Sequence, residues 1–141
     1  MNSRRGDEDD QGPVRHGDFA RRICRRGPDG ADVCKGGSGV DTAAYATRST
    51  PLSLTNDGAA NDGAAGEGDN IGTDVENLTG GQAADTITTP RTGANIASGG
   101  AGNDTLDVRD GIGPNGDKAD GGGGTDTCLA DTGDTRLACE N

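Results

Sequence analysis

A nine-residue rhythm constrains this chain more than any other feature of its sequence. Each unit opens on glycine, carries an acidic or amide side chain at its sixth position, and places a small or apolar residue at its eighth. The clearest units are 36–44 (GGSGVDTAA), 99–107 (GGAGNDTLD) and 121–129 (GGGGTDTCL). Because so short a unit cannot bury its apolar residue alone, successive units must stack on one another. The sequence therefore predicts a coil of stacked repeats rather than an ordinary globular core.

Looser copies of the unit extend the rhythm over most of residues 27–138. Units 27–35 and 80–88 match the pattern in part. Register alone places the remaining units, which are 71–79, 90–98, 112–120 and 130–138, the last with Leu137 in the inward slot. The rhythm is interrupted by Thr89, by the four residues VRDG at 108–111, and by a longer segment at 45–70.

The chain has too few apolar side chains for a conventional core. Leu, Ile, Val and Phe make up about 12% of its 141 residues, and the formal net charge is −11, a composition typical of disordered chains. Something other than apolar burial must therefore offset a chain entropy of roughly 1–2 kcal/mol per residue. Bound metal ions and disulfide bonds are the available candidates.

The negative charge is concentrated in the repeat region. Residues 27–141 carry 19 acidic and six basic side chains, an imbalance that disfavours nucleic acid and anionic membranes as partners and favours cations. No apolar run is long enough to span a membrane, and the N-terminus shows no apolar signal-peptide core. Residues 1–26 are polar and aperiodic, so we expect a flexible tail, and its His16, the only histidine, receives no role.

The GGxGxDxUx pattern, in which U is apolar, resembles the haemolysin-type (RTX) calcium-binding nonapeptide repeat family. The resemblance implies an all-β fold, a parallel β-roll with two units per lap, and Ca²⁺ bound between turns that stack on the same side. Independently, strands of stacked laps lie about 4.8 Å apart, which brings equivalent carboxylates together. Such carboxylates repel one another unless a cation lies between them.

The resemblance assigns the candidate calcium ligands to two columns on opposite edges of the roll. The first column comprises Asp85, Asp104 and Asp126, with the turn glycines Gly99, Gly100, Gly102, Gly121, Gly122 and Gly124. The second comprises Glu76, Asn95 and Asp117. Asp32 and Asp41 take the same slot in the first two units, where neither has an evident stacked partner unless 45–70 supplies one. The first column ranks higher because all its members are carboxylates.

The interrupting segment 45–70 combines a strand with an acidic stretch. Leu52 and Leu54 alternate with polar residues, which predicts a half-buried strand. The acidic residues that follow either form another cation site or belong to a solvated loop, and the loop composition favours the second interpretation. These residues are Asp57, Asp62, Glu67 and Asp69. Their spacing does not match an EF-hand calcium loop.

The four cysteines allow three disulfide pairings. Proximity in sequence favours Cys24–Cys34 and Cys128–Cys139, one at each end of the roll. A zinc site is the alternative, but the close C-x₂₋₄-C spacing that such sites use is missing. Disulfides, together with calcium ligation, indicate an oxidising, extracellular location.

These features predict a secreted structural module whose ligand is Ca²⁺ and whose folding requires that ion. We expect no enzymatic activity, because the sequence offers no Ser–His–Asp or Cys–His set. Two other interpretations stay open: an accessory C-terminal part of a larger secreted enzyme of protease or lipase type, and a disordered acidic spacer. Apart from calcium ions, the sequence indicates no particular partner.

Overall fold

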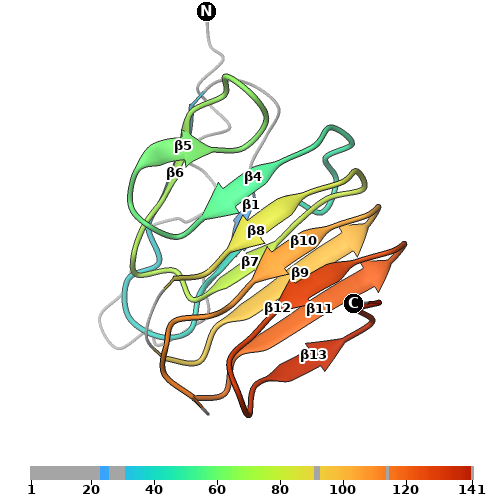
Figure 1. Ribbon diagram of the computed structural model, residues 1–141. Helices are drawn as coiled ribbons and strands as arrows, with labels where there is room; N and C mark the ends of the chain where they lie inside the picture. Colours follow the sequence, from blue (N-terminus) through green and yellow to red (C-terminus); the bar gives the residue numbers. More distant parts are fainter. Residues whose placement is uncertain (1–22, 26–30, 91–92, 114, 141) are drawn as a thin grey trace, which may run out of the picture.

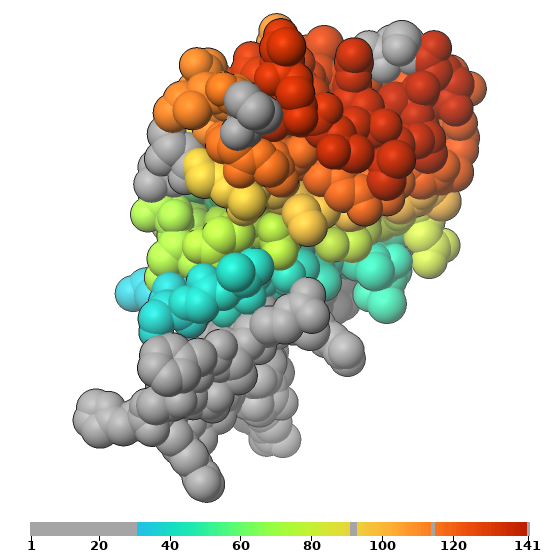
Figure 2. Space-filling view, turned by 90° about the horizontal axis from the view of Figure 1, so that it is seen from below, coloured from blue at the N-terminus to red at the C-terminus, as the bar shows by residue number. Residues whose placement is uncertain are grey.

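The structure is a computed structural model that describes residues 23–25, 31–90, 93–113 and 115–140. Its strands follow one another around a coil, and the laps stack in the order of the sequence (Figure 1). A space-filling view shows the same progression as bands of colour that run towards the C-terminus (Figure 2). The all-β parallel β-roll expected from the repeat is confirmed.

The longer sheet contains six strands, and every neighbouring pair in it is parallel. Across the sheet these strands are β1 (Ile23–Arg25), β3 (Thr42–Ala44), β7 (Asn77–Thr79), β9 (Ile96–Ala101), β11 (Lys118–Gly123) and β13 (Thr135–Leu137). A second parallel sheet contains β4 (Ser53–Thr55), β8 (Thr86–Thr88), β10 (Thr105–Asp107) and β12 (Thr127–Leu129). The chain alternates between the two sheets from β7 to β13, which is the winding of a β-roll.

A third, smaller sheet lies at the N-terminal end of the roll. It contains β2 (Val33–Cys34), β5 (Ala60–Asp62) and β6 (Asp69–Ile71). β2 pairs with β6 in parallel, whereas β5 and β6 are antiparallel. A single antiparallel bridge between Ser53 and Gly63 connects this sheet to β4.

The register of the strands explains the interruptions in the repeat. Thr86 pairs with Thr105, and Thr105 pairs with Thr127, so these two laps are 19 and 22 residues long. Each lap is thus two nine-residue units, lengthened by Thr89 in the first and by VRDG in the second. Both insertions follow the strand, so they lengthen a turn and leave the stacking of the strands intact.

The core between the two parallel sheets is a narrow double row of inward side chains, one from each of eight strands. One sheet contributes Ala43, Leu78, Ala97 and Ala119, and the other contributes Leu54, Ile87, Leu106 and Cys128, all fully buried. Successive side chains of a strand point to opposite faces, so the residue two positions earlier also faces inward. That earlier position is the aspartate slot of the repeat, which is how acidic side chains come to be buried.

The last lap departs from the expected register. Ala119 pairs with Arg136, so the lap from Lys118 to Thr135 has 17 residues, one fewer than two units. Leu137 is consequently 44% exposed, and its expected inward position is wrong. The physical reason is an early turn, in which Asp134 N donates a hydrogen bond to Asp131 O and the next strand begins at once.

Segment 45–70 is folded more tightly than its composition predicts. Leu52 and Leu54 are buried on and beside β4, as their alternation predicts. However, Asp62 and Asp69 are each only 1% exposed, so the solvated-loop interpretation is wrong for both. The reason is that the hairpin of β5 and β6 turns these two carboxylates towards backbone N–H groups of neighbouring strands.

Strand β1 lies within residues 1–26, the segment that the sequence assigns to a flexible tail, and it pairs with β3. The rest of that segment lies outside the described residues. So does the side chain of Cys24, and with it the expected Cys24–Cys34 disulfide. Across the described ranges, no helix is long and apolar enough to cross a membrane.

Candidate metal centre

Asp85, Asp104 and Asp126 form a ladder along one edge of the roll, here called the aspartate ladder. Asp104 Oδ1 accepts a hydrogen bond from Asp85 N at 2.8 Å, and Asp126 Oδ1 accepts one from Asp104 N at 2.7 Å. At the first rung, Asp85 Oδ1 accepts a hydrogen bond from Leu52 N. Each carboxylate is therefore fixed by the backbone of the preceding lap, and the predicted first column is brought together as expected.

The second carboxylate oxygen of two ladder residues is left over. Asp104 Oδ2 and Asp126 Oδ2 are buried and have no hydrogen-bond partner within the described residues. Both residues are only 1% exposed. A buried charged oxygen without a partner is costly, so each of these atoms favours the binding of either a proton or a cation.

Glycine at the start of each turn makes room for these oxygens. A Cβ added at Gly99 would overlap Asp104 Oδ2 and lie 2.6 Å from the carbonyl oxygen of Gly121 in the next lap. One lap earlier, a Cβ added at Gly80 would lie 2.5 Å from both Asp85 Oδ2 and Gly99 O. A carboxylate oxygen and a carbonyl oxygen thus converge beside a position that only glycine can occupy.

The other predicted glycines shape the turn itself. Gly100 and Gly102 have φ angles of 102° and 114°, which residues with a Cβ rarely adopt. Gly122 and Gly124 repeat this conformation one lap later. The glycine pattern of the unit is therefore explained by the backbone, and the carbonyl oxygens of successive turns are stacked as a result.

Burial raises the pKa of Asp104 to about 6, with a smaller contribution from the charges of Asp85 and Asp126 and against the lowering effect of the hydrogen bond from Asp85 N. Burial likewise raises the pKa of Asp85. Both shifts mean that the negative form of the ladder is disfavoured in the absence of a counter-charge. The ladder is therefore suited to bind positive charge.

The second column is less regular than the first. Asn95 N donates to Asp117 Oδ1 at 2.7 Å, so these two residues are stacked as predicted. Glu76 is in register with Asn95, because Asn77 pairs with Ile96, and it also stacks on Asp41, whose N–H donates to Glu76 Oε2. Between the two pairs, the series of hydrogen bonds from backbone N–H groups to carboxylates is interrupted, because Ile96 N donates to the amide oxygen Asn77 Oδ1.

Two residues missed by the sequence analysis, Asn115 and Asp134, complete the second edge. Asp134 lies directly after Asp117 in the stack, because Lys118 pairs with Thr135. Asp117 Oδ2, Asn115 Oδ1 and both carboxylate oxygens of Asp134 are buried without a hydrogen-bond partner in the described part of the chain. Burial raises the pKa of Asp117, and the charges of Asp110 and Asp134 add to the shift. An Asp-Thr dipeptide also stands at the start of β3, β8, β10 and β12 and could have revealed Asp134, but Asp131-Thr132 carries the same signal.

Asp32 and Asp41 both have stacked partners, and segment 45–70 supplies the one for Asp32, a possibility that the sequence left open. Asp32 N donates to Asp69 Oδ1, and Asp69 belongs to segment 45–70. Asp41 is stacked on Glu76. Neither partner could be found from the nine-residue register, because the intervening lap contains the irregular segment 45–70.

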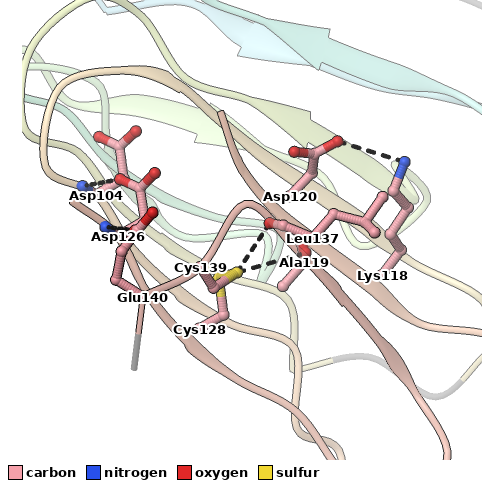
Figure 3. The surroundings of a disulfide bond; sticks show 9 residues. All are labelled: Asp104, Lys118, Ala119, Asp120, Asp126, Cys128, Leu137, Cys139 and Glu140. Carbon is pink, nitrogen blue, oxygen red and sulfur yellow. Dashed lines mark hydrogen bonds and ion pairs between the residues drawn. A yellow bond between two sulfur atoms is a disulfide. The ribbon is translucent and has the colours of Figure 1, made fainter. Parts of the chain in front are cut away.

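The C-terminus adds a carboxylate to the aspartate ladder that the sequence analysis also missed. Asp126 N donates to Glu140 Oε2 at 2.6 Å, and the expected disulfide between Cys128 and Cys139 lies beside this contact (Figure 3). Cys128 is fully buried, and the bond attaches the last residues to β12. The predicted Cys128–Cys139 pairing is therefore confirmed.

Side chains alone do not form a compact metal site. Within the described ranges, no group of three or more His, Cys, Asp or Glu side chains is arranged to hold a metal ion. The ladder instead offers one carboxylate oxygen per turn together with backbone carbonyl oxygens. Any metal ion held there would depend on the backbone of two successive turns.

The fold and this edge define a parallel β-roll with a buried ladder of aspartates. Compared with known proteins, the chain matches no family model, and no curated protein is detectably similar to it in sequence.

Proposed function

We propose that this chain is a calcium-binding β-roll that holds Ca²⁺ between successive laps of the aspartate ladder. The observation that carries the proposal is the pair of buried oxygens without a partner, Asp104 Oδ2 and Asp126 Oδ2. Asp104 Oδ2 lies close to the carbonyl oxygen of the next lap, beside a glycine. Surroundings made only of oxygen suit Ca²⁺, which takes six to eight oxygen ligands at roughly 2.3–2.6 Å.

The residues of the ladder divide the work of binding. The N–H groups at Oδ1 fix the orientation of each carboxylate, which leaves Oδ2 to contact the ion. Gly99 and Gly121 keep side chains out of the space beside these oxygens and contribute their carbonyl groups. When bound, Ca²⁺ supplies the positive charge that offsets the repulsion between the stacked carboxylates. Asp117, Asp134 and Asn115 offer a second candidate site on the opposite edge.

The proposal includes a dependence of folding on calcium. The chain has few apolar side chains and a large excess of acidic residues, so the metal-free roll must bury charge with little compensation. Since the unfolded chain has no preformed site, the free energy of binding becomes free energy of folding. Mg²⁺ should replace Ca²⁺ poorly, because it demands a small octahedral shell and gives up its water reluctantly.

A metal-independent roll is the second candidate, and a specific observation favours it. Every rung of the ladder already contains a hydrogen bond from a backbone N–H to a carboxylate, and the Cys128–Cys139 disulfide adds stability without metal. In that case protonation of the second oxygen, rather than calcium, would satisfy the ladder. A chelator should unfold the calcium-binding roll and leave the metal-independent roll folded.

Circular dichroism of the oxidised chain in chelator, in millimolar Ca²⁺ and in millimolar Mg²⁺ distinguishes them. We expect a coil spectrum in chelator, a strand spectrum in Ca²⁺ and little change with Mg²⁺. A strand spectrum in chelator that calcium leaves unchanged would favour the metal-independent roll. A coil spectrum in saturating Ca²⁺ would overturn both candidates and favour a disordered spacer.

We further propose that the module acts outside the cell and has no catalytic role. The Cys128–Cys139 disulfide supports the first point, because such bonds persist in oxidising compartments. The second is supported by the placement of the ladder carboxylates, which are buried between laps and bonded to the backbone. Secretion of the tagged chain and its calcium content in the medium would test the location.

A further inference from the structure

We propose that the C-terminal end of the roll holds an additional cation site, built from Asp126, Ala138 and Glu140 and assembled by the Cys128–Cys139 disulfide. The site rests on the proposed function, because it extends calcium binding to a turn in which Glu140, rather than the sixth residue of a unit, supplies the carboxylate. Figure 3 shows Asp126 and Glu140 in line with Asp104, with the disulfide next to them.

Glu140 makes the two hydrogen bonds that a further lap would make with the ladder. Inside the ladder, Asp104 donates its N–H to Asp126 Oδ1, and its carbonyl accepts the N–H of Thr127. Asp126 makes both bonds with a single residue: it donates to Glu140 Oε2 at 2.6 Å and accepts from Glu140 N at 2.9 Å. The longer glutamate side chain folds back to the place that the aspartate of another lap would take.

Ala138 supplies the carbonyl oxygen that glycine supplies elsewhere. A Cβ added at Gly121 would overlap both Asp126 Oδ2 and Ala138 O, just as one added at Gly99 meets Asp104 Oδ2 and Gly121 O. Ala138 has a φ of 51°, and it alone among the described non-glycine residues has a positive φ. Its backbone therefore adopts a conformation that its Cβ disfavours, and this conformation places the carbonyl next to Asp126.

The observation that points to a ligand is the second oxygen of Asp126. Asp126 Oδ2 is buried and has no hydrogen-bond partner in the described part of the chain. The adjacent carboxylate of Glu140 and carbonyl of Ala138 give this end of the ladder an oxygen-only set with two negative charges. Ala138 and Glu140 are exposed, so water can fill the rest of the coordination shell of a Ca²⁺ ion.

The disulfide connects this site to the redox state of the protein. Cys139 stands between Ala138 and Glu140 in sequence, and its bond to the buried Cys128 holds both beside Asp126. A dithiol reductant transfers two electrons and two protons to this bond, yields two thiols, and itself becomes a disulfide. Strand β13 ends at Leu137, so among the described residues reduction leaves the last ones held by the hydrogen bonds between Glu140 and Asp126 and by the contact of Cys139 Sγ with Ala119 O. Oxidation should therefore assemble the site and reduction should dismantle it.

Native mass spectrometry with calorimetric titration of the full chain tests this inference, with Ca²⁺ as the probe. We expect the oxidised chain to bind one more ion than the chain treated with dithiol, while the ladder ions are retained in both. Equal ion counts in the two states would overturn the terminal site and leave the proposed function intact. An absence of bound calcium in both states would overturn the proposed function as well.

Two variants keep the test independent of the reductant. Glu140→Gln retains the disulfide but removes one charge, and it should lose the additional ion in the oxidised state. Asp120→Asn is the matched control, because it removes one charge at the same end of the roll. Among the described residues, the carboxylate of Asp120 forms an ion pair with Lys118 only. An ion lost by both variants, or retained by Glu140→Gln, would contradict the assignment of Glu140.

Coupling between sites is reciprocal, so calcium should in turn protect the disulfide. Alkylation of Cys128 and Cys139 under a dithiol reductant should be slower in Ca²⁺ than in chelator. Glu140→Gln should reduce this protection, whereas Asp120→Asn should not. Protection that is equal in wild type and Glu140→Gln would mean that calcium acts through the ladder alone, which overturns the coupling.

Discussion

Two groups of buried aspartates in this molecule differ in how far the protein itself satisfies them. In segment 45–70, here also called the insertion, Asp62 Oδ1 accepts a hydrogen bond from Thr55 N and Asp62 Oδ2 accepts one from Ile71 N, so both oxygens have partners. Asp69 likewise accepts a hydrogen bond from Asp32 N with one oxygen and from the Tyr45 hydroxyl with the other. In the aspartate ladder, by contrast, Asp104 and Asp126 each keep one buried oxygen without a hydrogen-bond partner among the described residues.

The comparison teaches that burial of a carboxylate does not by itself indicate a metal site. Segment 45–70 uses both oxygens of its buried aspartates as acceptors that hold irregular strands together. In the ladder, Asp85 also uses both oxygens, but Asp104 and Asp126 each use only one in that way. The distinction lies in the lap-to-lap register, which presents one N–H and one glycine turn to each ladder aspartate. Our predictions therefore contrast one group with the other.

The largest expected effect is on calcium affinity in Asp104→Ala. Asp104 lies between Asp85 and Asp126, so its loss should weaken the binding of calcium on both sides, by about tenfold or more per site. Titration calorimetry measures this directly. Asp57→Ala, which removes an exposed carboxylate from the insertion, is the control and should leave the affinity unchanged. Equal losses in the two variants would mean that calcium is attracted only by the overall charge.

The next largest effect is on stability in Asp62→Ala. This change leaves the N–H groups of Thr55 and Ile71 without their acceptor, which should lower the free energy of unfolding by about 3 kcal/mol. The loss should be similar at all saturating calcium concentrations, because the insertion needs no ion. Urea unfolding at two such concentrations checks this. A deficit that higher calcium restores would place Asp62 among the metal ligands.

A smaller effect is expected from a single methyl group in the ladder turn. Gly99→Ala should lower the stability of the calcium-bound protein by about 1–3 kcal/mol, because the added Cβ overlaps Asp104 Oδ2. Gly123→Ala is the matched control: nothing lies within 4 Å of its added Cβ, and Ala101 occupies the paired position one lap earlier. Thermal unfolding in Ca²⁺ should separate the two variants, and equal melting temperatures would argue against crowding at the ladder.

The smallest effect concerns pH. Burial is the main cause that raises the pKa of both Asp62 and Asp104 to about 6, from an ordinary value of 3.8. A pKa raised by folding means that the folded protein holds the proton more tightly, so the stabilisation is full below the ordinary value and is lost as the pH rises through 6. In chelator, where the metal-free roll is disfavoured, the fraction of folded protein should therefore be larger at pH 5 than at pH 7. Saturating calcium should abolish the contribution of Asp104 to the pH dependence of stability and leave that of Asp62. Urea unfolding midpoints of wild type and Asp62→Asn in calcium, at both pH values, would reveal the difference.

Much of the regular part of this fold could be predicted because its determinants are local. The distance of two residues between Asp104 and Leu106 fixes both side chains on the same face of a strand, and the same rule applies in the other units up to 121–129. The repeat length then brings Asp85, Asp104 and Asp126 together without any knowledge of the tertiary structure. This explains why the aspartate ladder and the Cys128–Cys139 pairing emerge from sequence.

The remainder could not be predicted because it depends on contacts between distant residues. Asp32 meets Asp69 through a strand pairing across the insertion, which no nine-residue register describes. Glu140 lies only two residues after Ala138, so it reaches the ladder through its longer side chain rather than through a repeat. A single missing residue in the last lap moves Leu137 outward and Asp134 into the stack.

A crystal structure of the oxidised chain grown in calcium, with anomalous difference data, tests the central claim most directly. The account predicts calcium peaks between the turns of successive laps, about 2.3–2.6 Å from Asp104 Oδ2 and from a carbonyl oxygen of the neighbouring glycine turn. A further peak is predicted beside Asp126, Ala138 and Glu140. Strands and ladder unchanged from the present structure, with no anomalous peak at Asp104, would contradict the claim that the leftover carboxylate oxygens of the ladder hold calcium.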